Sequence, residues 1–485
     1  MHVLLSGVLP IALLLLAGCA TSSPQASLPA VQTQLSERAG VNATWPLTPE
    51  DRATADARVR ELVAADLTVE SAVQIALLNN RSLRATFEEL GLSQAGLAAA
   101  TRLPNPSFEA SVRWPPHPPR GPNVEFGLSA PLLEALLLPA RKNIAQKQLL
   151  QTQYRVSHEV LALVAEVRRA AYEVLAQQDL RVRLAVVAEI NGASADFGRR
   201  QFDAGNISKL DAAQLEASAQ QTQVELARAD AATGSARERL NRLLGLNSAQ
   251  ANWKMAGSLP DLPSGDALPE NLELIAQEQR LDLAALLTQS QLAQQAVNLK
   301  SRTRLLPGEV TLGVDTERDT GGQRVTGPRL AVQLPLFDQG QTELARLSAE
   351  LRQVQDREEA LSAEIGSEVR AARANLVASR RAAEFYRQTL LPQRRAILRE
   401  SLLHYNAMQK SVYELLTAKE QQQLTERDSV EALRDYWLAR TELERALGRR
   451  LPEPDQTKPE SPSNEKPKEP EAGPAAEPHP HHSAN

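Results

Sequence analysis

The sequence repeats itself once at an offset of about 200 residues, and this duplication limits the possible folds more than any other feature. Motifs of the first half return in the second half in the same order, and the offset drifts by only a few residues. Solenoid repeats have periods of roughly 20–50 residues, so the repeated unit here is the size of a domain. The matched positions are Ile75-Ala76 with Ile275-Ala276, Leu83 with Leu283, Leu103-Pro104 with Leu306-Pro307, Pro131 with Pro335, Ser208 with Ser411, and Gly245 with Gly448.

Each copy of the repeat predicts the same succession of elements. A helix that stops before a proline is followed by two short segments of alternating polarity, a very long helix, a brief break and another long helix. The chain is therefore predicted to be mainly α-helical with a small β part, built from a duplicated helix–β-hairpin–helix unit. The first copy has helices at 68–102, 140–201 and 207–244 and strands at 106–114 and 124–131; the second has helices at 268–304, 341–403 and 411–447 and strands at 309–316 and 328–335.

The long helices carry a heptad pattern. Apolar residues follow one another at spacings of four and three from Val156 through Val160 and Leu163 to Val167, and the series continues to Val174. Such a seam, with charges around it, is typical of coiled-coil packing between neighbouring helices. A helix of about 60 residues is roughly 90 Å long, which indicates an element that spans more than an ordinary globular domain.

The four short segments alternate apolar and polar residues. From Phe108 to Trp114 one face is Phe, Ala, Val and Trp, and the other is Glu, Ser and Arg. Val310, Leu312 and Val314 alternate with polar neighbours in the same way. A period of two suits transmembrane β-strands with one face toward lipid and one toward a lumen, and it equally suits a small soluble sheet with one wet face.

In a membrane, four strands alone would leave open edges, which lipid does not tolerate. We therefore expect the chain to oligomerise, with each copy contributing four strands. Three copies give a twelve-stranded β-barrel, an even number within the known range.

The N-terminus has the features of an exported lipoprotein. An apolar run over residues 3–16 leads into Leu-Ala-Gly-Cys, which resembles the bacterial lipobox. Residues 1–18 are thus expected to be a signal peptide, and Cys19 the lipidated first residue of a protein anchored in the outer membrane. Cys19 is the only cysteine, so no intramolecular disulfide is possible. The alternative is an ordinary secretory segment with an incidental cysteine.

Segments of low apolar content flank the repeats. Residues 19–47 are expected to form a lipidated leader without regular structure, and residues 451–485, rich in Pro, Glu, Lys and Ser, a disordered tail. The repeats then occupy residues 48–250 and 268–450, joined by a linker at 251–267. Three histidines near the end of the tail are candidates for weak metal binding or are incidental; they are His479, His481 and His482.

Composition and motifs argue against several functional classes. The net charge of −5 provides no electrostatic footprint for nucleic acid. The sequence has no phosphate-binding loop, no clustered Cys and His, and no catalytic constellation. We therefore expect neither an enzyme nor a cofactor, apart from the covalent lipid on Cys19.

Three further segments carry a resemblance to a known family. Pro335-Leu336-Phe337-Asp338-Gln339-Gly340 follows the fourth strand, and the helical breaks read Phe202-Asp203-Ala204-Gly205-Asn206-Ile207-Ser208 and Tyr405-Asn406-Ala407-Met408-Gln409-Lys410-Ser411. In this order and spacing, from about residue 67 to 448, the chain resembles the TolC-like outer-membrane efflux proteins. The resemblance implies a homotrimer, with a twelve-stranded barrel in the outer membrane and a long coiled-coil α-barrel through the periplasm.

By this resemblance the helical breaks form the periplasmic tip of the tunnel. Glu414 and Thr417 fall where the family carries acidic residues around a constriction, and Thr417 leaves one carboxylate per chain at that level. Tyr405 and Lys410 fall where the family ties neighbouring helices together in the closed state. Met408 replaces the usual turn glycine, which leaves the tightness of the second turn open. The residues expected to dock a periplasmic adaptor are Gly205, Asn206, Ser208, Asp211, Met408 and Ser411.

The function implied by the resemblance is a passive exit duct of a tripartite pump. Its expected partners are a periplasmic membrane-fusion adaptor, an inner-membrane pump of the RND type and outer-membrane lipid. Metal cations and drugs are the two candidate substrate classes. The alternatives are a protein-secretion duct of the same fold and a structural periplasmic coiled-coil lipoprotein without a pore.

Overall fold

The computed structural model describes residues 24–114, 116, 121–306 and 309–452. The chain divides into two compact units, one of residues 1–262 with 269–450 and a small one of residues 263–268 with 451–485. All helices and strands named below belong to the first unit. The predicted signal peptide, Cys19 and the three tail histidines lie outside the described residues.

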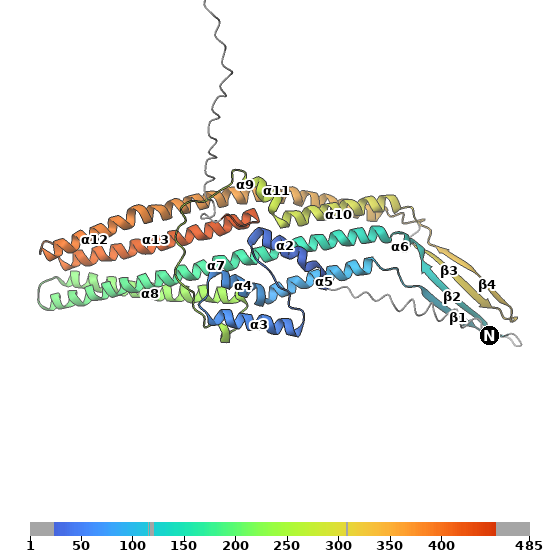
Figure 1. Cartoon of the computed structure of the whole chain (residues 1–485), viewed down its shortest axis with the longest axis horizontal. Helices are drawn as coiled ribbons and strands as arrows, with labels where there is room; N and C mark the ends of the chain where they lie inside the picture. The colour runs from blue at the N-terminus through green and yellow to red at the C-terminus, as the bar shows by residue number, and fades with distance from the viewer. Residues whose placement is uncertain (1–23, 115, 117–120, 307–308, 453–485) are drawn as a thin grey trace, which may run out of the picture. The chain divides into compact units, whose positions relative to one another are not determined.

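Figure 1 shows the duplicated order of elements that the sequence predicts. The first copy consists of α4 (Val69–Asn79), α5 (Arg81–Ala100), β1 (Ser107–Arg113), β2 (Asn123–Pro131), α6 (Leu132–Leu136), α7 (Leu138–Asp203) and α8 (Lys209–Leu244). The second consists of α9 (Leu272–Gln279), α10 (Leu281–Thr303), β3 (Val310–Arg318), β4 (Arg324–Val332), α11 (Gln341–Phe385), α12 (Leu391–Asn406) and α13 (Val412–Leu447). Among the helices of the described residues, none is both long and apolar enough to cross a membrane.

The first helix of each copy is divided in two, so the prediction of continuous helices over 68–102 and 268–304 is wrong. Asn80 and Arg280 interrupt them with extended backbone, at ψ of 116° and 122°. The Asn80 side chain caps the helix that follows and also donates to the carbonyl of Leu243 at 2.8 Å. Tertiary contacts therefore stabilise a break that local propensity does not reveal.

The same break receives the end of a long helix in both copies. Gly245 and Gly448, each with φ of 68°, follow α8 and α13. A Cβ on these glycines would lie 2.9 Å from the carbonyl oxygen of Asn79 and 3.2 Å from that of Gln279. Glycine is thus required here both by the left-handed backbone and by close approach.

The long helix predicted over 341–403 is interrupted by a π-helical turn at Tyr386–Leu390, between α11 and α12. Pro392 stands at the start of α12 and has no N–H to donate to the preceding turn. A π-turn is a common way to absorb such an irregularity inside a helix.

The leader is ordered where it is described, contrary to the expectation of a segment without regular structure. Residues Pro24–Ser27 and α2 (Leu28–Ala39) are helical, and α3 (Pro49–Ala64) follows. Val31 and Leu35 lie one helical turn apart and are fully buried. The segment is therefore part of the core, because its few apolar residues fall on one helix face.

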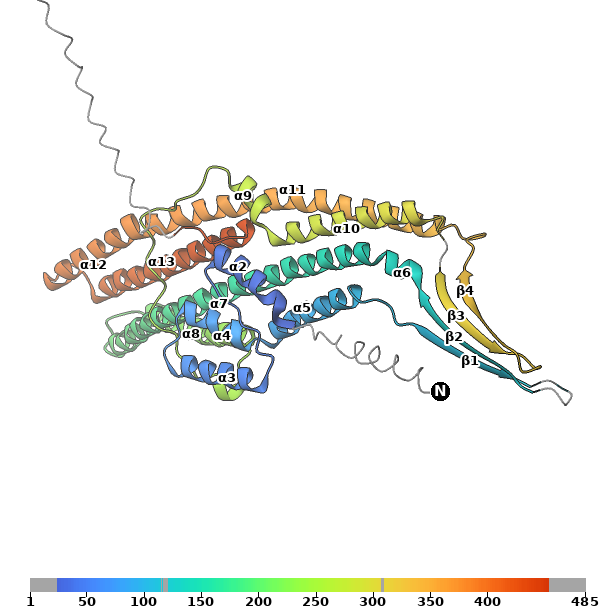
Figure 2. The same cartoon turned by 45° about the vertical axis from the view of Figure 1, so that its right-hand side comes forward.

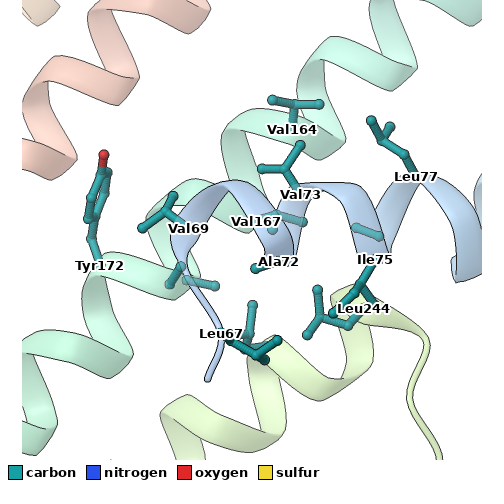
Figure 3. Packing of buried hydrophobic residues seen from close by; sticks show 14 of the residues in the cluster. Leu67, Val69, Ala72, Val73, Ile75, Leu77, Val164, Val167, Tyr172 and Leu244 are labelled. Atoms are coloured by element: carbon teal, nitrogen blue, oxygen red, sulfur yellow. The ribbon is translucent and has the colours of Figure 1, made fainter. Parts of the chain in front are cut away.

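An apolar core surrounds α7. In Figure 3, Val73 of α4 faces Val164 of α7, and Ile75 lies beside Leu244 of α8. The predicted heptad positions of α7 are buried apart from the partly exposed Leu163. With 66 residues, α7 is about 100 Å long, close to the expected length.

The strands form one antiparallel sheet in the order β1-β2-β3-β4. Figure 2 shows both hairpins directed away from the helices. The second hairpin is tighter than predicted. β3 continues to Arg318 and β4 already begins at Arg324, so the turn between them is short; it contains Gly322, with φ of 88°. Within the described chain, β1 and β4 each have a neighbour on one side only.

Candidate functional site

The turn between α7 and α8 is a compact helix C-cap. Gly205 adopts a left-handed backbone, with φ of 74°. Its N–H donates to the carbonyl of Phe202 at 2.9 Å, and the N–H of Asn206 donates to the carbonyl of Gln201 at 2.8 Å. This pair of bonds is the Schellman motif, in which glycine is the favoured left-handed residue.

The turn between α12 and α13 has the same geometry with a different residue. Met408 takes the left-handed position at φ of 58°, and it is the one non-glycine residue of the described chain with positive φ. Its N–H donates to the carbonyl of Tyr405, and that of Gln409 to the carbonyl of His404, both at 2.9 Å. The second turn is therefore as tight as the first. The Met408 side chain is nevertheless 95% exposed, and its left-handed backbone is strained.

Both turns lead into a helix through the same capping box. Ser208 accepts from the N–H of Asp211 at 3.1 Å, and the Asp211 carboxylate accepts from the N–H of Ser208 at 3.3 Å. Ser411 and Glu414 repeat this exchange, with distances of 3.3 and 2.9 Å. The Ser-x-x-Asp and Ser-x-x-Glu spacings are signatures of helix starts, so the sequence already contained this structural role.

Glu414 is exposed in the first turn of α13, and its carboxylate is held in place. The backbone N–H and then the hydroxyl of Ser411 donate to it, and these bonds lower the pKa of Glu414 below its usual value. The carboxylate is thus charged at neutral pH and points at the helix N-terminus, where the dipole favours negative charge.

The other predicted gate residues make no hydrogen bond or ion pair with Glu414, although the charge of Lys410 contributes to the lowered pKa of that carboxylate. Tyr405, Lys410 and Thr417 have side chains with no hydrogen bond or ion pair to any residue that the structure describes. Tyr405 and Thr417 are exposed, and Lys410 is half-buried. A single chain therefore leaves them available to other molecules.

Polar contacts between the two copies, which the sequence did not predict, lie further along the helices. The amide of Asn191 on α7 donates to Thr222 on α8 at 2.8 Å and to Glu420 on α13 at 3.0 Å. Arg183 on α7 pairs with Glu426 on α13 at 2.6 Å. A polar residue in a heptad seam is a recognisable signal, but the sequence does not say which distant helix supplies its partner.

The sheet separates apolar from polar side chains as predicted. Phe108, Leu128 and Val314 lie in register on one face, and all three are exposed. On the other face Arg329 donates to Glu109 at 2.9 Å and lies 3.7 Å from Asp315. These charged residues come from β1, β3 and β4, so the polar face is tied together across the whole sheet.

Gly127 of β2 makes this network possible. It lies in register between Glu109 and Asp315. A Cβ on Gly127 would be only 2.7 Å from a carboxylate oxygen of Asp315. Glycine therefore leaves the space that the charged side chains occupy above β2.

Metal-ligand clusters are absent from the part of the chain that the structure describes, where no group of three or more His, Cys, Asp or Glu could hold an ion. The predicted weak site at His479, His481 and His482 lies outside that part.

Comparisons with known proteins agree in sequence and in fold. Residues 72–246 match the family model described as outer membrane efflux protein. The chain is 27% identical over 390 residues to the cobalt-zinc-cadmium resistance protein CzcC of Cupriavidus metallidurans. The alignment covers 80% of this chain and 91% of that protein.

Several outer-membrane channels among the solved structures share this fold. The Campylobacter jejuni CmeC outer membrane channel has a TM-score of 0.64 at 14% identity, and the match covers 85% of this chain and 90% of that one. The outer-membrane channel OprN has a TM-score of 0.66 at 17% identity, over 80% and 92% of the two chains. The resemblance drawn from the sequence is confirmed.

The left-handed backbone at the two turns predicts opposite effects of matched substitutions. Met408→Gly should raise the free energy of unfolding by about 1 kcal/mol, because glycine relieves the strain at positive φ. Gly205→Met should lower it by a similar amount. Thermal unfolding followed by circular dichroism measures both. Destabilisation by Met408→Gly would contradict this account and assign the Met408 side chain a contact of its own.

Proposed function

We propose that this chain, a relative of the outer membrane efflux proteins, is the outer-membrane exit duct of a tripartite efflux pump. The sheet is the observation that carries the proposal. It exposes an apolar face, joins charged residues on the opposite face, and leaves the outer edges of β1 and β4 without a neighbouring strand within the described chain. Such a sheet suits lipid on one side and an aqueous lumen on the other.

The open edges support a homotrimer. Pairing of β4 of one copy with β1 of the next satisfies the backbone groups that a single sheet leaves free, which lipid requires. Three copies then form a closed barrel of about twelve strands. The helices of the three copies continue it as a coiled-coil tunnel in the periplasm.

The two helical turns are the proposed contact with a periplasmic adaptor, which links the duct to an inner-membrane pump of the RND type. The side chains of Tyr405, Lys410 and Thr417 make no hydrogen bond or ion pair to the described part of the chain. They can therefore bind neighbouring chains of the trimer in a closed tip. Contacts such as Arg183 with Glu426 join the two copies of the repeat and would limit how far the tip opens.

A structural coiled-coil lipoprotein without a pore is the competing class. It accounts for the heptad helices, but it has no use for a sheet with exposed Phe108, Leu128 and Val314 on one face. A protein-secretion duct of the same architecture is the second alternative. We favour efflux over secretion because the curated relative is named for metal resistance.

Conductance in planar bilayers tests the proposed function. The purified chain should form discrete, long-lived conducting steps, and its oligomer should dissociate on heating in detergent. The matched variant Cys19→Ser, which cannot take a lipid, should conduct equally, because the strands rather than the proposed anchor form the pore. A protein that inserts without conducting contradicts the duct, and loss of oligomers in Cys19→Ser contradicts the separate roles of lipid and strands.

Glu414 is proposed to contribute a ring of three carboxylates to the constriction. Glu414→Gln should lower the preference for K⁺ over Cl⁻ by about twofold or more, because the ring attracts cations and repels anions. The hydrogen bonds from Ser411 hold the pKa of Glu414 below its usual value, so the wild-type preference should be full at neutral pH and fall only in acid, as the carboxylates become protonated. The variant should show no such pH dependence. Equal selectivity of the two proteins at pH 7 would exclude Glu414 from the constriction.

Divalent metal cations are the substrate class that we favour over drugs, since the curated relative is a cobalt-zinc-cadmium resistance protein and the tail carries His479, His481 and His482. Deletion of the gene in its native organism should raise the sensitivity of the cells to zinc, cobalt or cadmium salts. Raised sensitivity to drugs alone would reverse the assignment.

A further inference from the structure

We propose that Arg318 and Arg324 form a binding site for the phosphate group of a lipid headgroup, on the outer surface of the sheet. The proposal rests on the function proposed above, because it requires the apolar face of the sheet to lie in a membrane.

The two arginines face each other directly. Arg318 ends β3, Arg324 begins β4, and the register pairs them as opposite residues. The same row continues through Val124 of β2 to Val112 of β1. Directly paired residues share a face, so both arginines stand on the apolar face, and both are exposed.

No carboxylate of the described chain neutralises this pair. Neither the Arg318 nor the Arg324 side chain has a hydrogen bond or ion pair to any residue in the described ranges. Asp319 accepts instead from the backbone N–H of Gln323 at 2.8 Å, and Glu317, on the opposite face, bonds to Asn123. Like charges directly opposite each other destabilise a strand pair, and a bound anion would remove that cost.

The position of the pair along the sheet corresponds to the headgroup level. Arg318 lies eight residues beyond Val310, about 26 Å along the strand, and the residues between them on this face include Leu312 and Val314. Trp114, which is 75% exposed, follows Val112 at the same end of the sheet. Tryptophan marks the interface between lipid and water, where arginine costs little on the lipid face.

A phosphate on a lipid fits this site better than a free anion. Arginine forks bind phosphate oxygens through paired, charge-assisted hydrogen bonds. A single pair of threonines, Thr316 and Thr326, separates the arginines from the apolar residues along β3 and β4. Acyl chains attached to the phosphate would pass this pair and lie along Val314, Leu312 and Leu330. The hairpins point away from the helices, which assigns the site to the outer leaflet when the helices are periplasmic.

Native mass spectrometry of the detergent-purified oligomer tests the site with diphosphorylated lipid A as the probe. The double variant Arg318→Gln, Arg324→Gln should retain the lipid about tenfold less than the wild type, because two charge-assisted contacts are lost. Arg113→Gln is the matched control, since Arg113 lies at the same end of the sheet but on the polar face, paired with Glu125. It should retain as much as the wild type.

A second arm separates phosphate from the lipid body. Wild-type protein should retain the dephosphorylated lipid about tenfold less than the phosphorylated one. Arg318→Lys, Arg324→Lys, which keeps both charges but loses the arginine forks, should retain more of the phosphorylated lipid than the glutamine variant and less than the wild type. If the glutamine variant does not assemble, the lysine variant and the comparison of the two lipids on the wild type still test the site. Equal retention of both lipids by the wild type, or equal losses in Arg113→Gln, would overturn the site. Bilayer conductance of the same proteins shows separately whether the duct itself fails.

Discussion

The apolar seam along α7 holds the two copies of the repeat in one structure. Helices α4, α5 and α8 of the first copy pack on it, and α10 and α13 of the second copy do so as well. Val160, Val167 and Val174 are fully buried along this seam. Because each copy completes its core on a helix of the other, the duplicated unit does not behave as two separate domains.

Polar contacts add register to this apolar seam. Asn191 meets Thr222 and Glu420, and Arg183 meets Glu426, so three long helices from both copies are aligned at particular levels. Long helices joined only by apolar seams slide more easily, whereas a buried amide specifies one register. The same contacts therefore connect stability to the proposed movement at the tip.

The sheet leaves two strand edges and one apolar face uncovered within the described chain. Within the described chain its two edge strands lack one neighbour each, and its apolar side chains are exposed. Gly127 and the charged residues beside it organise the opposite face. The helices bury a continuous apolar core around α7, whereas the sheet buries almost none of its apolar face within the described chain. This exposed face and the open strand edges are the physical basis for the proposed duct of several chains.

The sequence by itself determined the element order and the polarity of the strands, because both are local periodicities repeated at a constant offset. It also contained the capping boxes of Ser208 and Ser411. Only the tertiary structure decided that the first helices break at Asn80 and Arg280, since those breaks are stabilised by the distant ends of α8 and α13. Likewise, burial on the α7 seam ordered the leader through Val31 and Leu35, and two hydrogen bonds drew Met408 into a glycine-like turn. Contacts between residues far apart in the chain carry no local periodicity, so they became visible only when the helices were packed.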